Sequence, residues 1–221
     1  MKKVKIIIAT RNKGKVREMA NAFSALPVEL ISLADWEADL GLTEHPEPVE
    51  DGETFEENSF KKADFYAKLT GLPCIADDSG LEVEALGGAP GVYSARYSGE
   101  NATDEKNNAK LLADIKAKGL NESPAAYQCA LTFMNTDGGF IKEKGYCHGT
   151  IKCAEPKGEN GFGYDPYFYV DWQGESKTMV ELTVEEKHTL SHRGAALDKM
   201  AVSLGKIMMF LMRRKPKCVS V

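Results

Sequence analysis

The sequence predicts an α/β fold with two lobes. The chain opens with a β-branched apolar run, a polar loop and a helix, which is the order of a parallel β–α unit. Two long apolar segments further on are joined by a Gly-containing turn signal typical of an antiparallel hairpin. No internal repeat is present, so we expect the 221 residues to form one domain, 1–221.

Each element of the first third follows from its local pattern. Residues 4–9 are typical of a buried strand, residues 10–15 of a loop, residues 16–26 of a helix and residues 28–32 of a second strand. Residues 35–57 carry ten acidic side chains and neither lysine nor arginine, and are interpreted as a loop around Pro46 and Pro48. A helix over 53–69 follows that loop.

The remaining elements alternate between strands and helices. Two short strands are predicted at residues 73–77 and 81–84, the second because apolar and charged residues alternate there. Asp-Asp-Ser-Gly lies between them and a Gly-rich turn follows them. Thr103 is expected to cap a helix over 104–118, and residues 126–134 and 140–151 to form the hairpin. A strand at 167–170, a capping box at 183–186 and a helix from Ser191 to about Arg214 complete the prediction.

Composition excludes several classes of protein. The net charge of −5 argues against a nucleic-acid coat protein. No apolar run reaches the ~20 residues of a membrane span, and the N-terminal apolar stretch is too short for a signal peptide. The five cysteines form neither a CxxC nor a CxxH motif. We therefore expect a cytoplasmic protein that binds neither membranes nor nucleic acid and holds no zinc.

The first loop has the features of a phosphate-binding site. Its residues Thr10, Arg11, Asn12, Lys13, Gly14 and Lys15 leave a predicted strand and open a helix. Backbone N–H groups and the dipole at a helix N-terminus favour anions, and the two lysines add positive charge. The spacing is not that of a Walker A loop. The alternative is a polar loop with solvated lysines.

Acidic residues supply candidate metal ligands. Asp77 and Asp78 are predicted at the end of an apolar strand, where two carboxylates need a cation or hydrogen bonds. Mg²⁺ usually binds one or two carboxylates together with substrate phosphates. Residues 50–57 are also rich in carboxylates, one of which would reach a shared metal. The alternatives are a plain turn and a solvated acidic helix face.

A third cluster lies late in the chain. Residues 161–166 read Gly-Phe-Gly-Tyr-Asp-Pro, and glycines beside an aromatic allow close approach of a flat ring. His192 and Arg193 stand at the predicted start of a helix, where the dipole disfavours cations, so a nearby anion or acceptor would explain them. The alternative for His192 is a surface residue of the first helical turn. The basic residues 213–217 fit a helix C-terminus.

These motifs occur in one order and together resemble the family of noncanonical purine nucleoside triphosphate pyrophosphatases, also called inosine/xanthosine triphosphatases. The resemblance rests on Thr10-x-Asn12-x-Gly14-Lys15, Thr54-Phe55-x-Glu57-Asn58, residues 76–81, residues 87–97, residues 161–166 and Ser191-His192-Arg193-Gly194. It runs from about residue 3 to residue 211, nearly the whole chain.

The resemblance implies a two-lobed mixed-sheet fold with a cleft between the lobes, and a cytoplasmic homodimer that needs Mg²⁺. It implies hydrolysis of ITP, dITP and XTP to the monophosphate and pyrophosphate. It further implies that Asp78 is the proton acceptor, and that Glu50 and Asp78 bind the metal. The substrate contacts that it implies are Thr10, Arg11, Asn12, Lys13, Gly14, Lys15, Ser79, Phe162, Gly163, Tyr164, Asp165, Lys187, His192 and Arg193.

Purine selection has a physical rationale within this resemblance. Phe162 would stack on the base, while His192, Arg193 or backbone N–H groups would donate to O6 of hypoxanthine or xanthine. Adenine presents an amino group there and would leave those donors unpaired, which rejects an analogue by ~10⁴ or more. Arg11 and Ser59 depart from the family pattern, in which Gly and Ala are usual.

Three other functions are compatible with parts of the sequence. A pyrophosphatase acting on a pyrimidine or modified nucleotide would share the phosphate loop and the acidic residues. A nucleotide-binding regulatory protein without turnover would need no carboxylate pair, so Asp77 and Asp78 argue against it. A nucleic-acid binder would use the basic tail and would be retained on DNA in a salt-dependent way.

Overall fold

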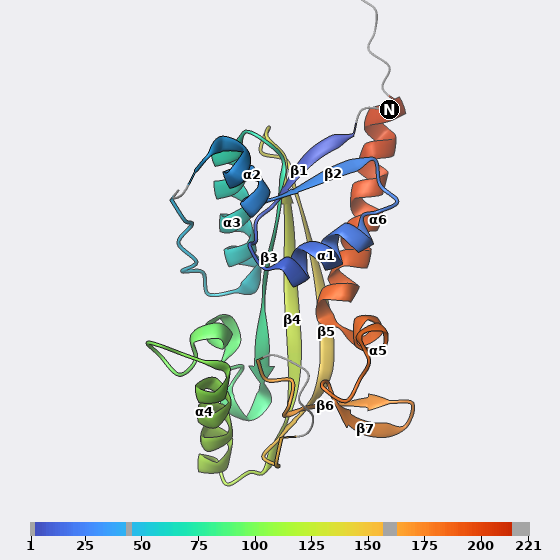
Figure 1. Ribbon diagram of the computed structural model, residues 1–221. Coiled ribbons are helices and arrows are strands. Elements are labelled where there is room, and N and C mark those ends of the chain that lie inside the picture. The colour runs from blue at the N-terminus through green and yellow to red at the C-terminus, as the bar shows by residue number, and fades with distance from the viewer. Residues whose placement is uncertain (1–2, 43–45, 157–162, 214–221) are drawn as a thin grey trace, which may run out of the picture.

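The computed structural model describes residues 3–42, 46–156 and 163–213 (Figure 1). Its strands form one seven-stranded sheet in the order β2-β1-β3-β4-β5-β6-β7. Their bounds are β1 Val4–Ile8, β2 Val28–Ser32, β3 Cys74–Val83, β4 Glu122–Met134, β5 Phe140–Lys152, β6 Phe168–Trp172 and β7 Glu175–Thr178.

Helices lie between β1 and β2, between β2 and β3 and between β3 and β4, and two more follow β7. The α-helices are α1 Lys13–Ala22, α2 Leu33–Leu40, α3 Phe55–Thr70, α4 Asp104–Ala117, α5 Val184–Leu190 and α6 His192–Arg213, and two 3₁₀ segments are η1 Glu84–Leu86 and η2 Gly91–Arg96. No helix within the described ranges has both the length and the hydropathy of a membrane span.

The sheet is mixed. Strand β1 runs parallel to β2 and to β3, whereas β3, β4, β5, β6 and β7 pair antiparallel with their neighbours. Strands β4 and β5 pair along their whole length and form the long hairpin that Figure 1 shows running through both lobes. This arrangement confirms the predicted parallel opening and the predicted later hairpin.

Helices cover both faces of the sheet at the end that carries β1 and β2, which is called the upper lobe (Figure 1). Because alternate side chains of a strand point to opposite faces, Ile6 and Ile8 pack in the core that α1 and α6 cover, whereas Ile7 packs in the core that α2 and α3 cover. All three isoleucines are fully buried. The β-branched run that predicted a buried strand therefore feeds two hydrophobic cores.

The lower lobe, which contains α4, β6 and β7, has a core of its own. Leu81 and Val83 at the end of β3 pack with Leu111 and Ile115 of α4 and with Phe168 of β6. Figure 1 shows α4, β6 and β7 around the end of the long hairpin that lies away from β1 and β2. The two lobes thus share β3, β4 and β5.

Most predicted elements are confirmed, with bounds shifted by a few residues, but two predictions are wrong and one strand was missed. The acidic region is not a loop throughout: α2 occupies part of it, capped by Ser32, whose Oγ accepts from the backbone N–H of Asp35 at 3.1 Å. Strand β7 was not predicted. The two short strands at 73–77 and 81–84 are one continuous strand, β3, so Asp77 and Asp78 lie in its middle rather than at its end.

A gap in strand pairing marks where the lobes meet. On one edge of β3, pairing with β1 ends at Ile75, and the chain of η2 begins to cover that edge at Leu81, whose N–H donates to Ser94 Oγ at 2.9 Å. Gly80 permits this approach, because a Cβ there would lie 2.4 Å from Ser94 Oγ and 2.7 Å from the carbonyl oxygen of Gly91. No described strand pairs with that edge between these points, around Asp77–Ser79.

Candidate functional site

Asp77 and Asp78 project from opposite faces of β3. Asp77 meets Lys15 of α1 and Arg193 of α6, whereas Asp78 meets Asn58 of α3. This follows from the two-residue period of a strand. The sequence-based view of one pair of neighbouring carboxylates is therefore wrong in its geometry, since each aspartate belongs to a different polar cluster.

Asp77 is a buried carboxylate held by two cations. Its side chain is 1% exposed, and its Oδ2 lies 2.8 Å from Lys15 Nζ and 3.4 Å from Arg193 Nε. Burial alone would raise the pKa of Asp77, but the charges of Lys15 and Arg193 outweigh burial and hold that pKa well below its usual value. Asp77 is thus ionised at neutral pH and fixes both cations.

Arg193 extends this cluster along the α6 face. Its Nη1 donates to Glu18 Oε2 at 3.1 Å and its Nη2 donates to Ser79 Oγ at 3.2 Å. Ser79 is two residues from Asp77 and shares its face of β3. The structure therefore brings the predicted residues Lys15, Ser79 and Arg193 together, although they are far apart in the sequence.

The first loop is organised by Asn12, which caps α1. Its Oδ1 accepts from the backbone N–H groups of Gly14 at 2.8 Å and Lys15 at 3.2 Å, and Thr10 Oγ1 accepts from the N–H of Asn12 at 3.2 Å. A Cβ at Gly14 would lie 3.1 Å from Asn12 Oδ1, so glycine suits this position. The N-terminus of α1 is therefore already capped, and the exposed side chain of Lys13 extends from its first turn.

Arg11 points away from this cluster, toward α2. Its Nη2 lies 2.9 Å from Glu37 Oε1, and its Nη1 lies 2.6 Å from Glu47 Oε1. The resemblance implies a substrate contact for Arg11, but these contacts favour a role in holding the first loop. In this structure two carboxylates already hold the guanidinium group.

Asp78 lies among groups from α3 and from the segment before it. Asn58 is 1% exposed and lies beside Asp78, while its Oδ1 accepts from the backbone N–H of Gly52 at 2.7 Å. Burial raises the pKa of Asp78. One oxygen, Asp78 Oδ2, is buried without a hydrogen-bond partner among the described residues, so it is a free acceptor.

Glu50 reaches the same cluster through Lys62. Lys62 Nζ lies 2.9 Å from Glu50 Oε2 and donates to the backbone oxygen of Asp77 at 3.1 Å. Burial lowers the pKa of Lys62, but Asp77 and Glu50 raise it by more, so the net pKa is raised. Asp51 instead pairs with Lys61 at 2.7 Å, and 68% of its side chain is exposed. Of these two neighbouring carboxylates, Glu50 is therefore the one beside Asp78.

The oxygen atoms around Asp78 are suitable ligands for a hard divalent cation. Glu50 and Asp78 supply carboxylate oxygens, and Asp78 Oδ2 is a buried acceptor that lacks a donor. No group of three or more His, Cys, Asp or Glu side chains within the described residues is arranged to hold a metal by itself. Two carboxylates fit Mg²⁺, which takes its other ligands from water and substrate phosphates.

An aromatic and ionic cluster lies on the α6 side, toward the lower lobe. The ring of His192 stacks on Tyr127, with centroids 5.0 Å apart and an interplanar angle of 14°. Burial, followed by the charge of Arg193, lowers the pKa of His192 to about 3, so the imidazole is neutral at pH 7. Tyr127 Oη donates to Asp165 Oδ1 at 3.1 Å, and Lys187 forms an ion pair with Asp165.

The remaining predicted residues flank this cluster. Tyr164 is buried and its Oη donates to the backbone oxygen of Ser94 at 2.7 Å. Gly163 precedes it in a left-handed conformation with φ of +60°. Phe162, expected from the resemblance to stack on the base, lies outside the described residues.

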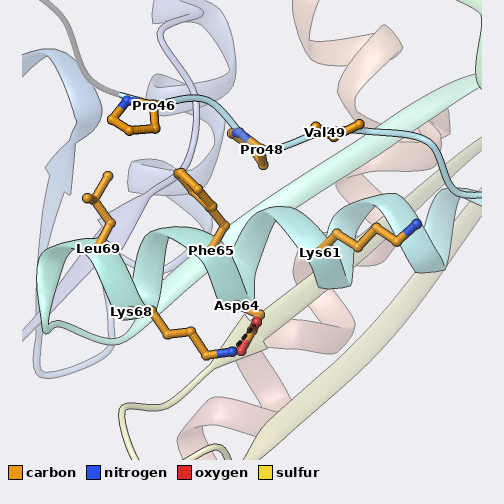
Figure 2. A pocket seen from close by; sticks show the side chains of 8 residues that line it. All are labelled: Pro46, Pro48, Val49, Lys61, Asp64, Phe65, Lys68 and Leu69. Atoms are coloured by element: carbon orange, nitrogen blue, oxygen red, sulfur yellow. Dashed lines mark hydrogen bonds and ion pairs between the residues drawn. The ribbon is translucent and has the colours of Figure 1, made fainter.

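A separate hollow lies on the outer side of α3. Figure 2 shows its lining, which combines the chain from Pro46 to Val49 with Lys61, Phe65 and Leu69 of α3, and its volume is about 580 Å³. Lys68 and Asp64 form an ion pair at its border. None of the residues in the two aspartate clusters lines this hollow, so it is distinct from the candidate site.

Sequence reasoning missed four side chains of the site. Lys62 and Glu18 resemble ordinary charged residues on helices, and only the fold shows that Lys62 lies between Glu50 and the strand. Tyr127 resembles a core aromatic. Asn58 belongs to the Thr54-Phe55-x-Glu57-Asn58 motif on which the resemblance rests, but no role was assigned to it there. Its place inside a helix, where asparagine is a poor helix former, was a second signal.

Comparisons with known proteins agree on one family. The model of the Ham1 family matches residues 6–203. The dITP/XTP pyrophosphatase of Geobacter sulfurreducens is 49% identical over 91% of this chain and 96% of that protein, and the dITP/XTP pyrophosphatase of Escherichia coli K12 is 46% identical over 90% and 98%. A solved HAM1 protein from Coxiella burnetii superposes with a TM-score of 0.82 at 38% identity, covering 92% of this chain and 99% of that one.

Proposed function

The chain belongs to the Ham1 family, and from that membership we propose that it hydrolyses the noncanonical purine nucleotides ITP, dITP and XTP to the monophosphate and pyrophosphate. It is a nucleoside triphosphate pyrophosphatase, and its proposed role is to remove deaminated purines from the nucleotide pool. One observation supports the chemistry above all. A free buried acceptor, Asp78 Oδ2, lies on the strand that also anchors Lys15 and Arg193.

The triphosphate is proposed to lie along the open edge of β3. Thr10, Asn12, Lys13, Gly14 and Lys15 would hold the phosphates, with Arg11 supporting the loop through its two glutamates. The substrate carries roughly four negative charges, so lysine ammonium groups there stabilise charge that develops on the leaving pyrophosphate. Asp77 keeps Lys15 in place for this task.

Asp78 is proposed to take the proton of the attacking water. The water oxygen bonds to the α-phosphorus, the bond from that phosphorus to the bridging oxygen breaks, and pyrophosphate leaves. The proton passes to Asp78 Oδ2. Burial raises the pKa of Asp78 and makes it a stronger base than an exposed aspartate.

Glu50 and Asp78 are proposed to hold Mg²⁺ together with the substrate phosphates. When bound, the ion neutralises phosphate charge and lowers the pKa of a coordinated water. Lys62 would hold Glu50 toward Asp78, since its ammonium group contacts both Glu50 and β3. Asn58 would hold the other end of the same segment through the N–H of Gly52.

Base recognition is proposed for the cluster around His192. A neutral imidazole and the guanidinium group of Arg193 both donate hydrogen bonds, which suits O6 of hypoxanthine or xanthine and not the amino group of adenine. Ser79, Gly163, Tyr164, Asp165 and Lys187 would line this region, and Phe162 is proposed to stack on the base.

We also propose a cytoplasmic homodimer in which residues 1–221 form one catalytic domain. Exposed aromatic side chains support a contact between copies: Tyr93 is 58% exposed and Tyr146 is 42% exposed. Tyr146 lies opposite Gln128 in the sheet register, and Gln128 and Tyr93 line one hollow. Mass measurement in solution tests the dimer, and the variant Tyr146→Glu is expected to weaken it.

A substrate panel tests the proposed activity. Purified protein is incubated with ITP, XTP, GTP, ATP and UTP, with and without Mg²⁺, and released pyrophosphate is measured. Pyrophosphate from ITP and XTP in the presence of Mg²⁺ supports the proposal. Turnover of UTP in preference to ITP would favour a pyrimidine enzyme, and binding without release would favour a regulatory protein.

A further inference from the structure

The first two turns of α4 carry polar side chains that core packing does not explain. Asp104 and Asn108 are four residues apart and so lie on one face of the helix. Asn108 is only 8% exposed, and asparagine is a poor helix former. Its Oδ1 is buried without a hydrogen-bond partner within the described residues. A buried amide satisfied only in part indicates a task other than stability.

Both side chains bind the backbone of one residue, Gly163. Asp104 Oδ2 accepts from the N–H of Gly163 at 2.7 Å, and Asn108 Nδ2 donates to the carbonyl oxygen of Gly163 at 2.8 Å. Gly163 has φ of +60°, a conformation that other L residues rarely adopt. Two bonds from one helix face therefore fix both backbone polar groups of a residue at which the chain turns sharply.

The chain after Gly163 leads directly into the candidate site. Tyr164 is anchored to the backbone oxygen of Ser94, and Asp165 pairs with Lys187 and accepts from Tyr127. Tyr127 in turn stacks on His192. A displacement of Gly163 would therefore move the groups assigned to the base, whereas Lys15 and Asp78 are held by other elements.

We propose that Asp104 and Asn108 are positioning residues that set residues 163–165 for nucleoside binding. This inference rests on the proposed function, because it assigns α4 a part in recognising the base of that substrate. Neither side chain is held to touch substrate. Their loss is expected to act on KM and on the preference for ITP over ATP, and to leave the step at phosphorus nearly unchanged.

The hydrogen bond to Gly163 is tested directly by nuclear magnetic resonance. The sequence contains a single Phe-Gly pair, 162–163, so protein labelled with ¹³C-carbonyl phenylalanine and ¹⁵N-glycine gives one carbon-coupled amide, that of Gly163. In Asp104→Ala its hydrogen exchange is expected to accelerate by about tenfold or more. Asp104→Asn keeps an oxygen acceptor and is expected to retain protection. Glu105→Ala is the matched control, because Glu105 is also acidic and in the first turn.

Kinetics then test the positioning role. Asp104→Ala and Asn108→Ala are expected to raise KM for ITP about tenfold and to lower the ITP-to-ATP preference, with kcat changed by less than about threefold. Asp104→Asn is expected to restore the native KM. An unchanged Gly163 amide in Asp104→Ala, or the same KM in Asp104→Ala as in Glu105→Ala, would overturn the inference.

The two proposals fail in distinguishable ways. A native protein that releases no pyrophosphate from ITP would contradict the proposed function. The Gly163 amide is measured without nucleotide, so it would still decide whether α4 holds this residue.

Discussion

The buried carboxylate of Asp77 makes a quantitative prediction about stability. In Asp77→Asn the side chain keeps its shape and loses its charge, so Lys15 and Arg193 lose the anion that lies 2.8 and 3.4 Å from them. Breaking a buried ion pair by removing one partner destabilises a protein by about 3–5 kcal/mol. Lys15 is 25% exposed and regains some hydration, whereas Arg193 is 8% exposed and does not. We therefore expect a loss of about 3 kcal/mol.

Urea unfolding followed by circular dichroism measures this loss. The matched control is Asp51→Asn, since Asp51 pairs with Lys61 at a similar distance, 2.7 Å, but its side chain is 68% exposed. An exposed ion pair contributes little to stability, so the control is expected to have the same urea midpoint of unfolding as the native protein. Equal midpoints for the two variants would refute the reasoning that burial, and not pairing itself, makes Asp77 important.

The same cluster connects stability to activity. Without Asp77, Lys15 is no longer held at the first loop and Arg193 is no longer held beside Ser79. Asp77→Asn is therefore expected to raise KM for ITP as well. This KM is measured without urea, at a temperature at which the variant remains folded.

Three further predictions follow from other contacts. Arg11→Ala is expected to cost less than about 1 kcal/mol in unfolding free energy and to change KM for ITP by less than about twofold, because exposed ion pairs hold its guanidinium group; a KM raised tenfold would instead assign Arg11 to the phosphates. Asn58→Ala is expected to lower kcat about tenfold at fixed Mg²⁺ and to raise the Mg²⁺ concentration needed for half-maximal activity, because the side chain joins Asp78 to the segment that carries Glu50; an unchanged Mg²⁺ requirement would contradict this. The pKa of His192 is about 3 in the folded protein and ordinarily 6.5, so between these pH values only the unfolded chain binds this proton, and stability falls as the pH drops below 6.5. From pH 7.5 to pH 5 the unfolding free energy of the native protein is expected to fall by about 2 kcal/mol more than that of His192→Gln. Equal losses in the two proteins would rule this out.

Local sequence signals predicted most elements because they are themselves local. The capping residue Thr103, the capping box at 183–186 and the hairpin turn each act through hydrogen bonds within a few residues. Helix α2 was missed although Ser32 and Gly41 mark its ends, because the density of acidic side chains favoured a loop interpretation.

The errors at β3 have a different origin. Asp-Asp-Ser-Gly has the composition of a turn, but register pairs with β4 along the whole of β3, including all four of these residues, hold it extended. Only once this strand is known to be continuous does the two-residue period assign Asp77 and Asp78 to opposite faces. The positions of Lys62 and Glu50 likewise depend on how α3 packs on the sheet, which no local pattern encodes.

Turnover by Asp78→Asn tests the central claim most directly. The variant keeps the size of the side chain and removes the carboxylate that is proposed to take the proton from water, so pyrophosphate release from ITP is expected to fall to background. Calorimetry should still detect ITP binding, because Lys15, Arg193 and the first loop are unchanged. Near-native pyrophosphate release by this variant would contradict the account.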